Sequence, residues 1–219
     1  MSAFLPSVEI DSGNSTHSVI WLHGLGADGH DFEPIVNELN LQHSIRFIFP
    51  HAPSMPVTVN NGMTMPAWYD IAAAQINQQQ DETGIRRSQT AILTLIEREI
   101  ERGINSQDII LAGFSQGGAI ALHTGLRFEK PLAGIMGLST YLPLISSVEN
   151  EITDANKSTS LFIAHGTHDP VIPLQLALDT NATLNKLGYT TEFHQYEMEH
   201  SVCPKEIDDI SMWINHCFS

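Results

Sequence analysis

Gly113-Phe114-Ser115-Gln116-Gly117 is the most informative pentapeptide of this 219-residue chain. An apolar run at 109–112 precedes it and small residues follow at 118–121, which predicts a strand, a sharp turn and a helix. A serine at the tip of such a turn needs a strained backbone, and glycines must stand where a Cβ would strike the neighbouring elements. A chance match would seldom fall between a β-rich run and an Ala/Leu-rich helix. We therefore predict that Ser115 is an exposed nucleophile.

Strand-like and helix-like segments alternate outward from this motif. Further strands are expected at 17–22, 45–49, 131–138, 161–165 and 190–196, and further helices at 31–39, 85–102, 173–187 and 205–217. This alternation predicts an α/β fold with a mostly parallel sheet and helices on both faces. No linker, repeat or break in composition divides the chain. We expect a single domain over 1–219, without a separate cap domain.

The composition excludes several classes of partner. Lys and Arg number 10 against 25 Asp and Glu, and the net charge of −15 repels phosphate backbones and anionic headgroups. Nucleic acid is therefore not an expected partner. The first residues lack a basic and an apolar region, and no apolar stretch is long enough to cross a membrane. Cys203 and Cys217 are too few for a disulfide framework, so we expect a cytoplasmic protein without integral membrane association.

Two further polar residues follow strands in the same way as Ser115. Asp169 comes just after the strand at 161–165, and His200 comes after the strand at 190–196. Because the carboxyl ends of parallel strands share one edge of a sheet, Ser115, Asp169 and His200 are expected at that edge. Their order along the chain is the order found in α/β-hydrolases. The sequence thus predicts a catalytic triad of nucleophile, acid and base.

Other candidates for the acid and the base lie in less suitable positions. Asp154 is in a polar loop before its strand, and Asp179 is inside a helix. The remaining histidines considered lie in a strand, in the last helix or in the loop of the acid: His194, His216, His165 and His168. His165, His168 and Asp169 could also be metal ligands, but no helix presents two of them on one face and no third ligand is indicated. No metal site is predicted.

A glycine-rich loop, His23-Gly24-Leu25-Gly26, ends the strand at 17–22. In serine hydrolases of this plan, such a loop supplies one backbone N–H to the oxyanion hole and the residue after the nucleophile supplies the other. The predicted donors are the N–H groups of Leu25 and Gln116. The alternative is an ordinary turn before the helix at 31–39.

The segment 51–80 is long and shows little periodicity, which is typical of functional or disordered loops. It carries apolar side chains that a solvated loop would not need, so we expect it to fold over the active site, with simple surface packing as the alternative. We predict that 55–76 sets acyl preference, with Trp68 as its main anchor. The predicted substrate contacts are Gly26, Met65, Trp68, Ile71 and Val171.

Several motifs together resemble those of a known family. They are Trp21-Leu22-His23-Gly24-Leu25-Gly26, Ala52-Pro53, Val57-Thr58, Trp68-Tyr69-Asp70, Gly113-Phe114-Ser115-Gln116-Gly117-Gly118, His165-Gly166, Asp169-Pro170-Val171, Tyr196 and His200-Ser201. This set is similar to the small carboxylesterase, lysophospholipase and acyl-protein thioesterase family. The resemblance implies a serine hydrolase that cleaves oxygen esters or thioesters of acyl chains without a cofactor.

The resemblance also ranks the activities. Residues 27–31 are similar to the bacterial carboxylesterases, which makes a carboxylesterase the first interpretation and an acyl-protein thioesterase or lysophospholipase the alternative. Met63 and Thr64 depart from the substrate loop expected in the family. The implied partner is a small acyl ester or thioester, a lipid or an acylated protein, and a homodimer is left open. A peptidase or a non-catalytic binding protein of the same fold is a more remote interpretation.

Overall fold

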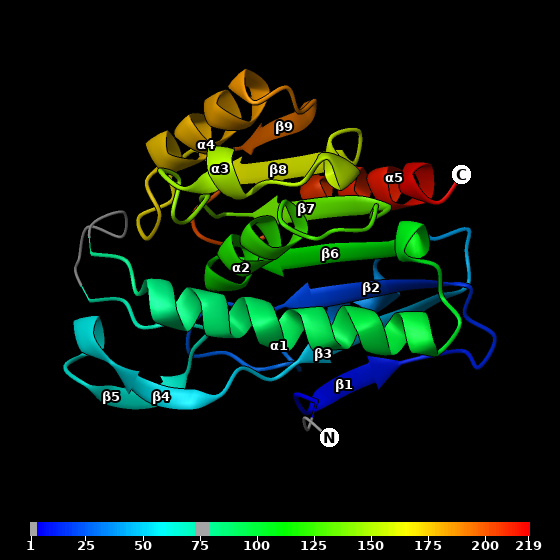
Figure 1. The fold of residues 1–219 in the computed structure, drawn as a ribbon, viewed down its shortest axis with the longest axis horizontal. Helices are drawn as coiled ribbons and strands as arrows, with labels where there is room; N and C mark the ends of the chain where they lie inside the picture. Colours follow the sequence, from blue (N-terminus) through cyan, green and yellow to red (C-terminus); the bar gives the residue numbers. More distant parts are fainter. Residues whose placement is uncertain (1–3, 73–78) are drawn as a thin grey trace.

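A computed structural model describes residues 4–72 and 79–219 and places a seven-stranded sheet at the centre of the molecule (Figure 1). The strand order is β1-β3-β2-β6-β7-β8-β9. The strands are β1 (Ser7–Ile10), β2 (His17–Leu22), β3 (Ile45–Pro50), β6 (Ile109–Phe114), β7 (Gly134–Leu138), β8 (Ser160–Gly166) and β9 (Thr191–Tyr196). Only β1 is antiparallel to its neighbour in this sheet. The predicted, mostly parallel α/β-hydrolase fold is confirmed.

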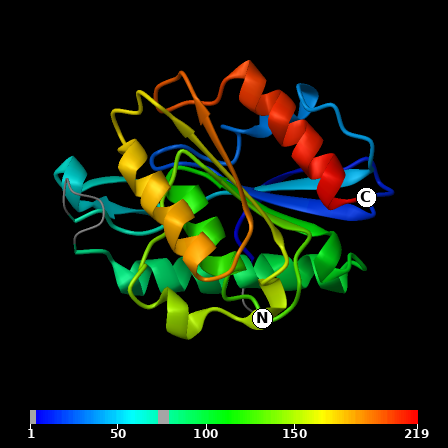
Figure 2. The ribbon, with the colours of Figure 1, turned by 90° about the horizontal axis from the view of Figure 1, so that it is seen from above.

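Helices cover both faces of the sheet (Figure 2). On one face lie α1 (Glu82–Glu101), α2 (Gln116–Gly125) and α4 (Leu174–Lys186), and on the other lies α5 (Pro204–Cys217). The shorter helices are α3 (Val148–Glu151) and the 3₁₀ helices η1 (Glu33–Asn37), η2 (Thr58–Asn60), η3 (Ser106–Asp108) and η4 (Asp154–Asn156). Each face of the sheet has its own buried apolar cluster. Strand β6 is apolar along most of its length because both of its faces are covered.

Residues 51–80 differ from the sequence-based expectation. They contain an antiparallel pair, β4 (Ser54–Val57) and β5 (Met63–Pro66), that stands apart from the main sheet. Prolines at both strands obscure the pattern, since a proline cannot donate to a strand ladder. The end of the predicted acyl segment, at 73–76, lies outside the described residues.

Two other elements depart from the prediction. The helix expected over 31–39 is the short 3₁₀ helix η1, which has no side-chain cap. The antiparallel edge strand β1 was not predicted at all. Within the described ranges, none of the helices combines the length and the apolar character needed to cross a bilayer.

Candidate active site

Ser115 lies between the end of β6 and the start of α2, with φ of 54° and ψ of −121°. Non-glycine residues rarely adopt this conformation. Glycines on either side make the turn sterically feasible: a Cβ on Gly113 would lie 2.4 Å from the Gly117 carbonyl group, and a Cβ on Gly117 would lie 2.4 Å from the backbone oxygens of Leu22 and His23. The backbone of the predicted elbow therefore has the geometry that presents a serine hydroxyl at a strand end. Ser115 itself is only 8% exposed, so the expectation of an exposed side chain is wrong.

The side chains of Ser115, His200 and Asp169 form one hydrogen-bonded chain. His200 Nε2 is 2.9 Å from Ser115 Oγ, and His200 Nδ1 is 2.7 Å from Asp169 Oδ2. The other carboxylate oxygen, Asp169 Oδ1, accepts the N–H groups of Val171 and Ile172 at 2.8 and 2.9 Å. A nucleophile, a base and an orienting acid are thus within hydrogen-bonding reach of one another.

Asp169 is held in its ionised form despite its burial. Burial alone raises the pKa of this carboxyl group, but the hydrogen bonds from His200 and from the two backbone N–H groups outweigh burial. The net result is a pKa of Asp169 below its ordinary value of 3.8. The carboxylate can therefore hold the Nδ1–H of His200 and stabilise positive charge on its ring.

The alternative acids and bases lie elsewhere in the described structure. Asp154 belongs to η4 and Asp179 to α4, and neither contacts His200. His194 on β9 pairs with Glu192 at 2.8 Å. His165 is buried, lies 2.8 Å from the carbonyl oxygen of Ile172 and is 3.4 Å from Asp169 Oδ2. His165 thus braces the loop of Asp169 through the carbonyl oxygen of Ile172.

The predicted oxyanion donors come from two neighbouring segments. Within the described residues, neither the Leu25 N–H nor the Gln116 N–H donates a hydrogen bond to another protein group. Gly26 has a φ of 77° and donates its N–H to the Pro66 carbonyl oxygen at 2.9 Å. The close packing of Gly117 against the backbone of His23 brings the glycine-rich loop beside the elbow. The two N–H groups are thus available to a negatively charged oxygen.

Trp68 is only 1% exposed, so its ring is part of the core and not a free face for a ligand. Its Nε1–H donates to the His23 carbonyl oxygen at 2.8 Å, and its backbone N–H donates to Gln116 Oε1 at 2.9 Å. The Gln116 side chain in turn donates to the Tyr69 carbonyl oxygen at 2.7 Å. This placement argues against Trp68 as the anchor of an acyl chain. It also gives Gln116 a side-chain role that the sequence did not suggest.

The other predicted substrate contacts are more accessible. Gly26 is exposed, Met65 on β5 and Ile71 are half-buried, and Val171 is 53% exposed beside Asp169. Met65 lies against Gly26, since a Cβ built on this glycine would be 3.7 Å from the methionine sulfur. Met63, at the start of β5, is 65% exposed. Apolar side chains of the hairpin and of the Asp169 loop are therefore available to a ligand at this edge.

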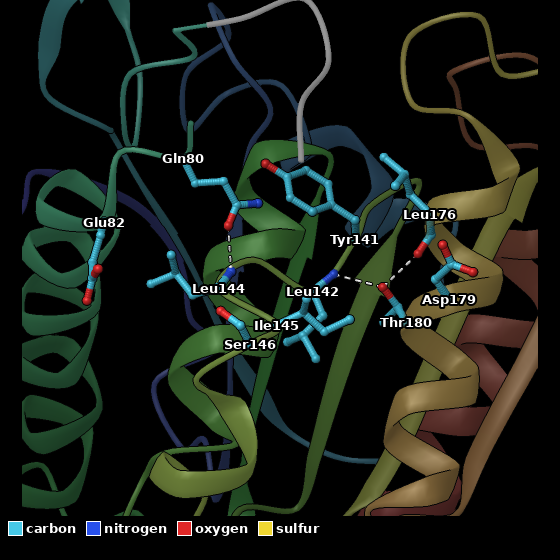
Figure 3. Close-up of a pocket in the computed structure, with 10 residues that line it drawn as sticks. All are labelled: Gln80, Glu82, Tyr141, Leu142, Leu144, Ile145, Ser146, Leu176, Asp179 and Thr180. Carbon is cyan, nitrogen blue, oxygen red and sulfur yellow. Dashed lines mark hydrogen bonds between the residues drawn. The ribbon is translucent and has the colours of Figure 1, made fainter. Parts of the chain in front are cut away.

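A cavity of about 460 Å³ lies between α1, α4 and the segment after β7 (Figure 3). Its walls include Gln80, Tyr141, Leu142, Leu144, Ile145 and Leu176. Tyr141 directly follows Thr140, whose hydroxyl donates to the Ser115 carbonyl oxygen, so one wall of the cavity continues from the elbow. This cavity is not predicted from the sequence. The apolar run at 141–145, two residues after a buried strand, is the signal that could have indicated it.

The fold and the geometry at Ser115 define an α/β-hydrolase of the serine hydrolase kind. The family model described as phospholipase/carboxylesterase matches residues 5–218, and the chain belongs to this family. An acyl-protein thioesterase 1 from Neurospora crassa is 42% identical over 207 residues, which cover 89% of this chain and 84% of that protein. The protein of the same name from Yarrowia lipolytica is 39% identical over 218 residues, with coverage of 95% and 96%.

Solved structures agree with this assignment. SOBER1 from Arabidopsis thaliana has a TM-score of 0.88 at 31% identity, covering 93% of this chain and 99% of that one. Acyl-protein thioesterase 2 from Zea mays has a TM-score of 0.85 at 24% identity, with coverage of 99% and 100%, and adds support for the fold alone. The resemblance inferred from the sequence motifs is confirmed. The protein is a hydrolase of the esterase and thioesterase kind.

Proposed function

We propose that the protein hydrolyses thioesters that link acyl chains to proteins. The hydrogen-bonded chain from Asp169 through His200 to Ser115 carries the proposal of a serine hydrolase. The choice of thioester rests on relatives of 36–42% identity that are named acyl-protein thioesterases. A general carboxylesterase, the first interpretation from the sequence, is therefore less well supported than its thioesterase alternative.

In the proposed mechanism Ser115 Oγ attacks the carbonyl carbon of the thioester. His200 Nε2 takes the hydroxyl proton, while Asp169 stabilises the charged imidazole ring. The N–H groups of Leu25 and Gln116 hold the oxygen of the tetrahedral intermediate. The C–S bond then breaks, the thiol leaves with the proton from His200, and an acyl group remains on Ser115.

Water completes the cycle by hydrolysing the acyl-enzyme. Water is now the nucleophile, and Ser115 Oγ is the leaving group. His200 removes a proton from a water molecule, which attacks the acyl carbonyl carbon. The second tetrahedral intermediate expels Ser115 Oγ, which recovers a proton from His200. The products are a free carboxylic acid and the deacylated protein, and no redox step is involved.

The test compares a peptide palmitoylated through a cysteine thioester with the same peptide carrying serine in an oxygen ester. We expect the thioester to have the higher kcat/KM. Ser115→Ala should abolish turnover of both substrates and labelling by a fluorophosphonate, because only a base-activated serine is nucleophilic enough near neutral pH. Labelling that persists in Ser115→Ala, or appears at another serine, would rule out this nucleophile.

Oxygen esters are the second candidate, because the matching family model is described as phospholipase/carboxylesterase. Both reactions pass through the same acyl-enzyme, so a lysophospholipid and a short nitrophenyl ester belong in the same comparison. A lipid or an acylated protein is thus the proposed partner. We propose a cytoplasmic location, in which the thiols of Cys203 and Cys217 stay reduced. A homodimer stays a prediction, which a measurement of the molecular mass in solution would test.

A further inference from the structure

In each of the two peptide groups assigned to the oxyanion hole, a side chain bonds to the carbonyl oxygen, at the end opposite to the N–H. The Leu25 N–H belongs to the peptide group whose carbonyl is that of Gly24, and the Gln116 N–H belongs to the one whose carbonyl is that of Ser115. Each of these carbonyl oxygens is bonded by a buried side chain. His23 Nδ1 lies 2.7 Å from the Gly24 oxygen, and Thr140 Oγ1 donates to the Ser115 oxygen at 2.7 Å.

The surroundings of His23 fix its tautomer. The backbone N–H of Ala52 points at His23 Nε2 over 3.1 Å, so this nitrogen must accept. Nδ1 therefore carries the proton and donates it to the Gly24 oxygen. The ring is 1% exposed, and burial lowers the pKa of His23, which keeps it neutral. The donor at Gly24 is thus permanent under ordinary conditions.

Thr140 is held as firmly on the other side of the site. It is 1% exposed, and its methyl group fills the space left by two glycines: a Cβ on Gly118 or on Gly137 would lie 2.9 Å from Thr140 Cγ2. With the methyl group fixed there, the hydroxyl group points at the Ser115 oxygen. That oxygen already accepts the N–H of Ala119 at 3.1 Å, in the first turn of α2. The bond from Thr140 is therefore not needed merely to satisfy a buried carbonyl group.

A hydrogen bond at one end of a peptide group affects its other end. The group is planar and its electrons are delocalised, so a donor at the oxygen fixes the plane and draws charge from the nitrogen. The N–H then becomes a stronger donor, by about 10–30% in estimates of hydrogen-bond cooperativity. Pre-set orientation matters most at an oxyanion hole, where donors must already face the position of the developing charge.

We propose that His23 and Thr140 are positioning residues of the oxyanion hole, each acting through the peptide group whose carbonyl oxygen it binds. This inference rests on the proposed function, since it presumes that the Leu25 and Gln116 N–H groups hold the oxyanion. It assigns to the reaction two side chains that do not touch the substrate.

The main test replaces Thr140 by valine and, as a matched control, by serine. Thr140→Val keeps the shape and both branches at Cβ but removes the donor, whereas Thr140→Ser keeps the donor. We expect Thr140→Val to lower kcat about 10-fold with KM changed less than about 2-fold, a smaller loss than the 10²–10³ seen when an oxyanion donor is deleted. Thr140→Ser keeps the donor but loses the methyl group that fixes it, so it should retain clearly more of kcat than Thr140→Val.

A second readout separates positioning from general loss of structure. Each variant is assayed on a nitrophenyl ester and on its thiono analogue, in which sulfur replaces the carbonyl oxygen. Sulfur is a weak hydrogen-bond acceptor, so an intact oxyanion hole favours the oxygen ester much more than the thiono ester. The ratio of the two rates should therefore fall in Thr140→Val and be preserved in Thr140→Ser.

His23 offers an independent pair of variants. The amide nitrogen of asparagine can occupy the place of Nδ1 and donate to the Gly24 oxygen, whereas glutamine reaches the place of Nε2 and serves only Ala52. We expect His23→Asn to retain more of kcat and of the ester preference than His23→Gln, although both lose stability. Thermal unfolding of each variant, measured under the assay conditions, shows that the compared proteins are folded.

Equal kcat values in Thr140→Val, Thr140→Ser and the parent enzyme would overturn the inference. Equal losses on the ester and the thiono ester in Thr140→Val would overturn it as well, because they would indicate a structural role only. In either case a loss of turnover in Ser115→Ala would leave the proposed function intact. Unchanged turnover in Ser115→Ala would instead reject the proposed function itself.

Discussion

Asp169 illustrates how much a single side chain depends on its partners. Its Oδ1 must accept the N–H groups of Val171 and Ile172, while Oδ2 faces His200 Nδ1. An amide in this position has no freedom to flip, because its oxygen is needed by the two backbone donors. In Asp169→Asn the NH₂ group must therefore face His200, which forces the ring to carry its proton on Nε2.

The expected result is an enzyme without a functional base. With a proton on Nε2, His200 cannot accept the hydroxyl proton of Ser115, and kcat should fall by about 10⁴, as in a serine protease with the same change. Asp154→Asn, in η4, is the control and should have little effect on kcat. A mild loss in Asp169→Asn, measured on a nitrophenyl ester, would show that another acid orients the base.

The sequence was sufficient to predict the positions of Ser115, Asp169 and His200, because each follows a recognisable buried strand. It was not sufficient for Trp68. A tryptophan in an apolar loop can equally face a ligand or the core, and the choice depends on partners distant in sequence, here His23 and Gln116. The bonds of His23 and Thr140 to the carbonyl oxygens of the oxyanion peptide groups could not be predicted for the same reason.

The segment 66–69, which begins at the end of β5, connects three parts of the site. Its Pro66 oxygen accepts the Gly26 N–H, and Trp68 and Tyr69 bond to Gln116 at the start of α2. On the outer side, Ser88 of α1 donates to the Trp68 carbonyl oxygen. The hairpin β4–β5 is thus tied to the glycine-rich loop, to the elbow helix and to α1.

Removing the Trp68 ring should therefore damage the site as a whole. We expect Trp68→Ala to lower the free energy of unfolding by about 3–5 kcal/mol, because a large buried side chain leaves a cavity. kcat/KM should fall by a similar factor on acetate, butyrate and octanoate esters. Trp68→Phe keeps most of the packing and should lose about 1 kcal/mol with its Nε1–H donor. Losses that grow with chain length would instead show that Trp68 contacts the acyl chain.

The opposite end of the sheet is held by a buried carboxylate. Glu99 of α1 is fully buried and accepts from Ser18 of β2 and Arg46 of β3 at 2.8 Å each, with Arg102 at 3.1 Å. Arg98 and Arg102 continue the network to Glu9 of β1. Glu99 therefore connects α1 directly with β2 and β3, and through Arg98 and Arg102 with β1.

Loss of Glu99 should be costly for stability but not for catalysis. Glu99→Ala removes the shared acceptor of Ser18 and of partly exposed arginines that keep Asp11 and Glu9 as partners, and we expect the free energy of unfolding to fall by about 1.5–3 kcal/mol with kcat unchanged. Glu97 is the matched control, since it pairs with Lys130 at the surface of the same helix and its loss should cost less than about 1 kcal/mol. Urea titrations that give equal costs for both variants would refute the structural role of Glu99.

The degree of burial explains which strands could be predicted from the sequence. Strand β2 was predicted with its observed bounds, because six residues form an apolar run that ends at a glycine loop. The edge strand β1 has only four residues, is half-buried and alternates weakly, so its pairing with β3 leaves little trace in the sequence. The hairpin was hidden because its regularity comes from strand pairing, not from a buried face.

The stability of the molecule as a whole depends on pH through buried histidines and a buried carboxyl group, whose effects on stability have opposite pH dependence. Burial lowers the pKa of His23 and His165, and lowers that of His123 to about 3. Below their ordinary pKa of 6.5, these histidines bind more protons in the unfolded chain than in the folded protein. Their contribution to stability is therefore lost as the pH falls below 6.5. A carboxyl group on α5 acts in the opposite direction.

That group is Glu206, which is fully buried in the first turn of α5. Burial raises the pKa of Glu206 from 4.5 to about 8, since it outweighs the opposing effect of the Cys203 backbone N–H, and the charge of Asp209 adds to the rise. Between these values the folded protein holds a proton that the unfolded chain has lost. The stabilisation is complete below pH 4.5 and is lost as the pH rises through 8, a change of roughly 3–5 kcal/mol.

Glu206→Gln should remove this dependence, because glutamine is neutral in both states. We expect the variant to match the parent protein near pH 5 and to exceed its free energy of unfolding by a few kcal/mol above about pH 8. Asp208→Asn, at an exposed position of the same helix, removes one negative charge from a net charge of −15 without this effect. Because added salt weakens repulsion between surface charges but not the desolvation of a buried one, the gain of Glu206→Gln should persist at high salt. A gain that salt abolishes, or that Asp208→Asn reproduces in urea titrations, would assign the effect to surface charge instead.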